Sequence, residues 1–221
     1  MLIEQRSDAW FELRKGKMTS SEIYKIMGEG RAKDGLSETA KTYLLERVSE
    51  KLGGAPALSH PVGSRPAALE WGFELEELAC NVYQEKRGLV VEKASFMIYN
   101  DYYGGSPDGL VNPDGIIEIK CPFASANHFK HGLIETDADF KKVATPYYYQ
   151  CLSNIICANA QWCDFISYDP RVQDDCGLFV YRLHRNEEEV ENLKNRVDTA
   201  IVYMNELKER ILKKAQPQIL T

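Results

Sequence analysis

A carboxylate in the middle of an apolar β-type run restricts most strongly how this chain can fold. The run Ile116-Ile117-Glu118-Ile119 consists of β-branched isoleucines around a single glutamate. The turn sequence Asn112-Pro113-Asp114-Gly115 precedes it, which favours a hairpin. Its isoleucines predict a strand that is half buried. Burying a lone ionised carboxylate is costly. We therefore expect Glu118 to have a partner.

The N-terminal part has apolar residues at helical spacing. Hydroxyl residues at 19–21 offer N-caps for a short helix that ends near Gly28, and a mobile loop is expected over 28–35. Ser37 should cap a second helix that reaches about Leu52, and a long helix is predicted over 67–86. Between these two helices the sequence predicts a linker, marked by Pro61, Gly63 and Pro66.

The middle of the chain changes to short β-type runs, which predict an antiparallel meander. These runs are Val90-Val91, Phe96 to Tyr99, Leu110-Val111 and Ile116 to Ile119. Pro146 should then open a helix to about Ala160. Two more strands follow, over 162–168 and 178–183, and a last helix begins at Glu187 with acidic residues in its first turn, as the helix dipole prefers.

This order of elements predicts an α/β or α+β sandwich without internal repeats. The chain has 221 residues, of which 44% are hydrophobic and 27% charged, which is typical of a globular domain with a substantial core. We expect a single domain over 1–221, with a core at about 8–185 and a C-terminal helix at about 187–214.

Charge is unevenly distributed along the chain. The net charge is -6, which argues against a wholly basic, nucleic-acid-coating surface. Residues 14–33 nevertheless contain six basic side chains against two acidic ones, whereas 135–139 and 187–191 are acidic. A basic rim could therefore hold phosphates. The opening residues lack the pattern of a signal peptide, so a cytoplasmic location is expected.

The cysteines favour reduced, structural thiols. There are six of them and none forms a C-x-x-C pair. The spacing of Cys151, Cys157 and Cys163 is regular but too wide for a zinc knuckle, and no histidine lies close by in the sequence. We expect neither a zinc site nor an iron–sulfur cluster.

The hairpin places two acids and a lysine within reach of one another. Glu118 and Lys120 share one face of a strand, and Asp108 lies ten residues before Glu118, across the turn. Paired carboxylates, with the backbone carbonyl of Ile119 and water, suit Mg²⁺ or Mn²⁺. A lysine there can orient an attacking water and stabilise a phosphorane-like transition state. The alternative is a surface hairpin with an ordinary Glu/Lys face.

Four segments together resemble the bacteriophage lambda exonuclease family of YqaJ-like viral recombinases, within the restriction-endonuclease-like PD-(D/E)xK superfamily. The resemblance spans about 8–185 and implies a central mixed β-sheet flanked by helices. The segments are Asp8-Ala9-Trp10 through Leu13-Arg14-x-Gly16 with Thr19-x-Ser21-Glu22; Leu69-x-Trp71-Gly72-x-x-x-Glu76; Ser106-Pro107-Asp108-Gly109-Leu110 with Glu118-x-Lys120-Cys121-Pro122-Phe123; and Tyr168-Asp169-Pro170-Arg171 after a helix with Gln150.

The resemblance implies a catalytic centre. Asp108, Glu118 and the Ile119 carbonyl would hold two Mg²⁺ ions, or Mn²⁺, while Lys120 serves the attacking water and Glu76 supports the metal site. Taken alone, Glu76 would be an ordinary solvated helix acid.

The resemblance also implies DNA contacts. A pocket for a 5′-phosphate would consist of Arg14, Ser21, Ser106 and Gln150. A guanidinium and two hydroxyls suit a phosphate dianion. By themselves Ser21 would be a helix cap and Gln150 a surface amide. Arg31 would reach the DNA groove, and Leu69 would act as an apolar wedge at the duplex end or, alternatively, belong to the helix core.

The implied function is a Mg²⁺-dependent 5′-to-3′ exonuclease on linear double-stranded DNA with a 5′-phosphate. It would release mononucleotides and leave a 3′ single strand for a strand-annealing recombinase. The family further implies a homotrimer, encoded by a phage or prophage and acting in the bacterial host cytoplasm. The alternatives are a RecB-like or Cas4-like end-processing nuclease of other polarity, or an inactive DNA-binding protein of the same fold.

Overall fold

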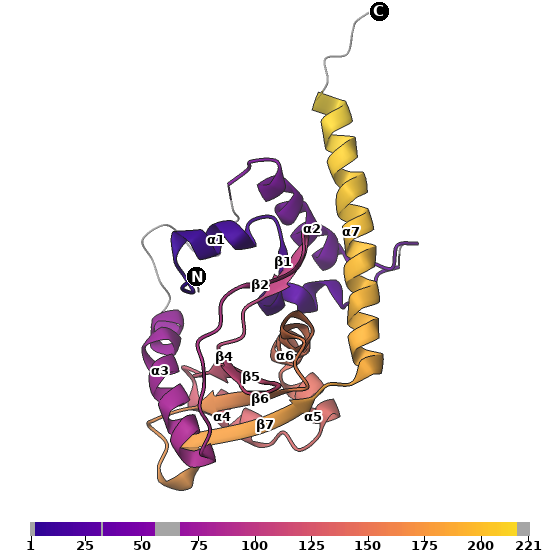
Figure 1. Ribbon diagram of the computed structural model, residues 1–221. Coiled ribbons are helices and arrows are strands. Elements are labelled where there is room, and N and C mark those ends of the chain that lie inside the picture. The colour runs from indigo at the N-terminus through magenta and orange to yellow at the C-terminus, as the bar shows by residue number, and fades with distance from the viewer. Residues whose placement is uncertain (1–2, 32, 56–66, 216–221) are drawn as a thin grey trace, which may run out of the picture.

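A four-stranded mixed sheet flanked by helices occupies the lower half of the view in Figure 1. The computed structural model describes residues 3–31, 33–55 and 67–215. The sheet has the order β4 (Gly109–Val111), β5 (Gly115–Lys120), β6 (Trp162–Tyr168) and β7 (Leu178–His184). The β5–β6 pair is parallel, whereas β4–β5 and β6–β7 are antiparallel. The predicted α/β class with a central mixed sheet is confirmed.

The predicted single meander is wrong, because its strands divide between two sheets. A second sheet has the order β1 (Met18–Thr19), β3 (Tyr103–Gly105) and β2 (Met97–Asn100), and β1 pairs with β3 in parallel. The sequence did not predict β3, since its two glycines hide any alternation. The run Val90-Val91 forms no strand; next to it, Glu92 makes an isolated bridge with Leu110.

Most of the predicted helices are confirmed within a few residues. They are observed as α2 (Glu38–Lys51), α3 (Ala67–Arg87), α6 (Thr145–Ala158) and α7 (Glu187–Ala215). The Ser37 hydroxyl caps α2 by accepting a hydrogen bond from the Ala40 N–H at 3.2 Å. The helix predicted after Thr19 is a 3-10 helix, η1 (Ser20–Ile26). The linker residues Pro61, Gly63 and Pro66 lie outside the described residues.

Four short helical elements were missed because each is too short for a clear apolar period. They are α1 (Asp8–Arg14), α4 (Ser125–Gly132), α5 (Asp137–Val143) and η2 (Asp174–Gly177). The helices α4, α5 and α6 together make the crossover that a parallel β5–β6 pair requires. Among the helices that the structure describes, none is long and apolar enough to cross a bilayer.

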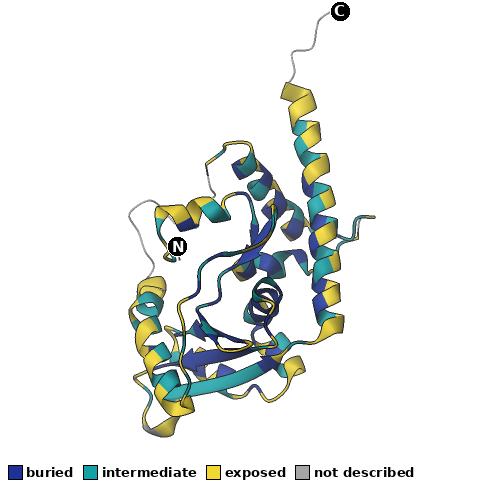
Figure 2. Cartoon of the chain, in the orientation of Figure 1, coloured by how far each residue is buried: buried dark blue, intermediate teal, exposed yellow. Residues whose placement is uncertain are grey.

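The two faces of the four-stranded sheet belong to different apolar clusters, so β5 and β6 are buried on both sides, whereas most of β7 is only half-buried (Figure 2). Ile116 and Phe165 pack into the cluster that includes α6, α2 and α7. Ile117 and Ile119 pack into the smaller cluster that includes Ala79 and Tyr83 of α3. This alternation along β5 places the side chain of Glu118 on the α6 side, in the position of a core residue.

The long helix α7 holds the loop that follows η1. It packs along α2, as Figure 1 shows, and its Arg196 donates hydrogen bonds to the carbonyls of Ile26, Gly28 and Gly35. The loop over 28–35, expected to be mobile, is therefore tied at both ends, with Arg31 exposed between the ties.

Candidate active site

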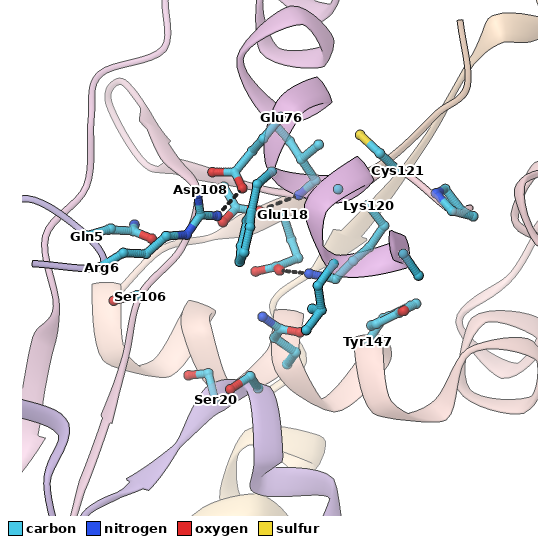
Figure 3. Close-up of a pocket in the computed structure, with 18 of the residues that line it drawn as sticks. Gln5, Arg6, Ser20, Glu76, Ser106, Asp108, Glu118, Lys120, Cys121 and Tyr147 are labelled. Atoms are coloured by element: carbon cyan, nitrogen blue, oxygen red, sulfur yellow. Dashed lines mark hydrogen bonds and ion pairs between the residues drawn. The ribbon is translucent and has the colours of Figure 1, made fainter. Parts of the chain in front are cut away.

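A cavity of about 310 Å³ opens where α1, η1, α3, α6 and the β4–β5 hairpin meet (Figure 3). All the predicted site residues except Arg31 line it, although they come from separate parts of the chain. These residues are Arg14, Ser21, Leu69, Glu76, Ser106, Asp108, Glu118, Ile119, Lys120 and Gln150.

The hairpin brings Asp108 beside Glu118. The Asp108 N–H donates to the Ile117 carbonyl at 3.0 Å, which continues the β4–β5 pairing, and the Asp108 carboxylate accepts a hydrogen bond from the Ile119 N–H at 2.7 Å. Glu118 is fully buried. One of its oxygens forms an ion pair with Lys120, and the other accepts a hydrogen bond from Asn154 of α6 at 2.9 Å. Glu118 therefore has the partner that the sequence required, in Lys120 and in Asn154, which the sequence did not indicate, and the surface-hairpin alternative is wrong.

Burial and neighbouring negative charge disfavour the ionised forms of Asp108 and Glu118. Burial and the charge of Glu118 raise the pKa of Asp108 well above its usual range, and burial also raises the pKa of Glu118. Burial disfavours the charged form of Lys120, but Glu118 and Asp108 outweigh it, so the pKa of Lys120 lies above its usual range. Lys120 thus remains an ammonium donor at neutral pH.

These donors fit a hard divalent cation. Two buried carboxylates that resist simultaneous ionisation gain from a cation that takes the place of a proton. Within the described residues no group of three or more His, Cys, Asp or Glu side chains is arranged for a metal ion. Mg²⁺ needs no such group, because one or two carboxylates, with water and substrate phosphate, normally complete its octahedral shell. Asp108, Glu118 and the Ile119 carbonyl would hold it here.

Glu76 extends this acidic centre from α3. It lines the cavity, and its charge contributes to the raised pKa of Asp108. Its carboxylate forms an ion pair with Arg6, a residue that no sequence pattern singled out (Figure 3). The side chain of Glu76 is 31% exposed, so it is not simply a solvated helix acid.

A second group of polar side chains lines the cavity around Trp10 of α1. The indole N–H of Trp10 donates to the Ser106 hydroxyl at 2.9 Å, and the Arg14 guanidinium lies 4.0 Å from the centre of the Trp10 ring. Burial lowers the pKa of Arg14 to about 10, which leaves it charged at neutral pH. Ser21 and Gln150 line the same cavity from η1 and α6. A cation, two hydroxyls and an amide thus face one space.

The structure decides between several alternatives. Gln150 is 9% exposed, so it is not a surface amide. Ser21 lies within η1, whose N-cap is Thr19, so it is not the cap. Leu69 is 41% exposed in the first turn of α3 and lines the cavity, so it does not belong to the helix core.

Other lining residues carried no sequence signal of their own. Gln5 and Arg6 precede α1 in a turn, and Tyr147 lies at the start of α6, where its ring centre is 5.2 Å from the Lys120 ammonium. They lie 27 or more positions from the hairpin lysine along the chain. Only tertiary packing brings them to it.

Comparisons with known proteins agree with this architecture. The family model of the YqaJ-like viral recombinase domain matches residues 9–161. An alkaline exonuclease (LHK-Exo) from Laribacter hongkongensis superposes with a TM-score of 0.77 at 27% identity, over 95% of this chain and 98% of that one. Its complex with dAMP superposes equally well, at 28% identity with the same coverage.

A phage-related exonuclease from Haemophilus somnus 129PT, at 22% identity, shares the fold with a TM-score of 0.71 over 88% of this chain and 96% of that one. No curated protein matches the sequence. The family model covers more than half of the chain, including the elements that build the cavity. The chain therefore belongs to the YqaJ-like viral recombinase domain family.

Proposed function

We propose that this chain is a Mg²⁺-dependent 5′-to-3′ exonuclease that degrades the 5′-ended strand of linear duplex DNA to mononucleotides, leaving a 3′ single strand for annealing. One observation carries the proposal: the carboxylate–lysine hairpin and the group around Arg14 open into the same cavity. The side chains of the hairpin can catalyse phosphodiester hydrolysis, and the side chains around Arg14 can bind the terminal phosphate of a strand. Their common cavity suits an enzyme that cuts close to a strand end.

The hydrolytic side uses Asp108, Glu118 and the Ile119 carbonyl to hold the cation. When bound, Mg²⁺ would activate the attacking water and neutralise the charge that develops on the phosphate. The Lys120 ammonium, charged and held against Glu118, donates a hydrogen bond to that water and stabilises the negative transition state. Since Lys120 stays protonated, it acts as a donor and not as a general base.

The anchoring side binds the 5′-phosphate. Arg14, held over Trp10, presents its guanidinium, while Ser21, Ser106 and Gln150 supply neutral donors. Each cut would leave a new 5′-phosphate to enter the same pocket, which favours processive digestion. The complex of the Laribacter hongkongensis enzyme with dAMP supports a mononucleotide product.

The charge distribution and the length of the chain bear on how the protein would assemble on DNA. The basic segment 14–33 would face the DNA phosphates, and Arg31 on its exposed loop would reach the groove. We propose a single nuclease domain that forms a homotrimer around the duplex, since one chain of 221 residues is too small to encircle it. Its partner would be a strand-annealing recombinase, and its setting the cytoplasm of a bacterium that carries the phage or prophage.

A time course on an end-labelled linear duplex tests the activity. Wild type with Mg²⁺ should release labelled mononucleotide from the 5′ end, faster from a 5′-phosphate than from a 5′-hydroxyl. Lys120→Ala should abolish turnover but retain DNA binding, whereas Lys130→Ala, on the exposed face of α4, should behave as wild type.

Three outcomes would contradict the proposal. Release that starts at the 3′ end would favour the RecB-like or Cas4-like alternative. Full activity in Lys120→Ala would refute the mechanism. Absence of Mg²⁺ or Mn²⁺ binding by calorimetry, with DNA binding intact, would favour an inactive DNA-binding protein.

A further inference from the structure

The residues before α1 are tied across one edge of the cavity. The Ile3 N–H donates to the Ser95 hydroxyl at 2.9 Å, and that hydroxyl donates to the Ile3 carbonyl at 2.8 Å. The Gln5 amide donates to the carbonyls of Ala94 and Pro107. Pro107 immediately precedes Asp108, so this segment has a defined position relative to the carboxylate pair.

Arg6 lies in a turn that favours a different residue type. The Ser7 N–H donates to the Glu4 carbonyl at 3.3 Å, and Arg6 occupies the third position of this turn with φ 70°. A positive φ at that position is typical of glycine, which has no Cβ, and of asparagine, whereas other residues such as arginine rarely adopt it. The chain accepts an unfavourable conformation there and thereby projects an arginine into the cavity.

The Arg6 guanidinium is held close to the acidic centre. It forms an ion pair with Glu76 and lies 3.9 Å from the centre of the Phe73 ring (Figure 3). Its side chain is 42% exposed, and a pair this accessible adds little to the stability of a fold. Stability alone therefore does not explain an arginine in this turn.

The charges around the cavity leave Arg6 suited to an incoming anion. Among the described lining residues the cations are Arg6, Arg14 and Lys120. Lys120 is engaged by Glu118, and Arg14 belongs to the proposed 5′-phosphate pocket. Arg6 pairs with the partly exposed carboxylate of Glu76, and a backbone phosphate, which carries the same charge, can take the place of that carboxylate. A guanidinium matches phosphate oxygens in a two-pronged geometry.

We propose that Arg6 binds a backbone phosphate of the DNA strand that ends in this cavity, exchanging Glu76 for that phosphate. The inference rests on the proposed exonuclease function. It adds a contact beside Glu76 of α3 to the one that Arg14 of α1 would make. A strand end would then be held at two points, at its terminal phosphate by Arg14 and at an internal phosphate by Arg6.

The test measures DNA binding over a series of NaCl concentrations. A fluorescent duplex with a 5′-phosphate is titrated by anisotropy, with Ca²⁺ in place of Mg²⁺. Arg6→Gln should weaken DNA binding. It should also make the plot of the logarithm of the association constant against the logarithm of the NaCl concentration less steep, by about 0.9 for a duplex phosphate or about 0.7 for a single-strand phosphate. Arg6→Lys should keep the wild-type slope. Lys86 of α3 forms another exposed ion pair, with Asp175. Lys86→Gln removes its charge and should show the DNA affinity and salt dependence of wild type.

Two further variants separate a phosphate contact from neutralisation of Glu76. Arg6→Gly removes the side chain but adopts a positive φ readily, so it should fold and still show the reduced slope. The double variant Arg6→Gln with Glu76→Gln removes both charges and should keep the deficit. If the double variant regains the wild-type slope, or if Arg6→Gln and Arg6→Gly bind as wild type does, the inference is wrong. If wild type neither binds nor digests DNA, the proposed function itself fails.

Discussion

The indole N–H of Trp10 donates a hydrogen bond to the Ser106 hydroxyl at 2.9 Å, across 96 positions of sequence. This bond joins α1 to the segment that leads into the carboxylate hairpin. The same indole ring supports the Arg14 guanidinium. One side chain thus positions two residues of the proposed phosphate anchor.

Trp10→Phe should weaken the anchor but spare the hydrolytic centre. The phenyl ring still supports Arg14, whereas the Ser106 hydroxyl loses its donor and becomes free to rotate. Loss of one hydrogen bond corresponds to about 1 kcal/mol, so we expect a roughly 5-fold smaller preference for 5′-phosphate over 5′-hydroxyl ends. Digestion rates on the two substrates measure this ratio. An unchanged ratio would show that Trp10 does not position Ser106 for phosphate.

Asp108→Asn should inactivate the protein and yet stabilise its metal-free form. The charge of Asp108 is disfavoured by burial and by Glu118, so a neutral isostere relieves repulsion. Loss of a metal-binding carboxylate should lower activity at least about 100-fold. Thermal melts in EDTA should show a higher Tm than wild type.

The matched control is Asp164→Asn in β6. Asp164 is also fully buried, but it accepts hydrogen bonds from Tyr83 and Arg182. Removing its charge leaves Arg182 without its ionic partner, so the Tm should fall. A lower Tm for both variants would mean that the charge of Asp108 is not destabilising in the folded protein.

Leu69→Ser should slow the digestion of blunt duplex ends more than that of ends already frayed by mismatches. Leu69 is 41% exposed in the first turn of α3, so its replacement should change the free energy of unfolding by no more than about 0.5 kcal/mol. Its proposed role is to part the terminal base pairs. Initial rates on matched and mismatched ends measure the effect. An equal loss on both substrates would rule out a wedge.

His131 should make stability depend on pH between about 4 and 6.5. Burial, aided by His128 and Lys120, lowers the pKa of His131 from 6.5 to about 4. The unfolded chain then binds a proton that the folded chain does not, so stability falls as pH drops through this range. The free energy of unfolding should decrease by about 3 kcal/mol from this residue.

Urea unfolding at several pH values tests this expectation. His131→Gln should flatten the dependence between pH 6.5 and 4, whereas His184→Gln, at an exposed position of β7, should leave it as in wild type. If the free energy of unfolding changes with pH in the same way for His131→Gln and for wild type, His131 is not buried in its neutral form.

Local sequence patterns were sufficient to predict much of the fold. The Ser37 cap and the apolar period predicted α2, and the isoleucine run predicted β5 and the common face of Glu118 and Lys120. These relations join residues two to four positions apart, which backbone geometry alone dictates. The strand β3 escaped detection because Tyr103-Gly104-Gly105 has no alternation; its burial depends on neighbours elsewhere in the chain.

The sequence by itself determined a hairpin with two acids and a lysine, a family resemblance and a basic N-terminal segment. Only the tertiary structure decided that the strands divide into two sheets, that Trp10 links Ser106 to Arg14, and that Arg6 reaches Glu76. The physical reason is the distance along the chain over which each kind of information acts. Hydrophobic periodicity records which face of an element is buried, whereas the meeting of side chains 70 or 96 positions apart depends on how buried faces pack against one another.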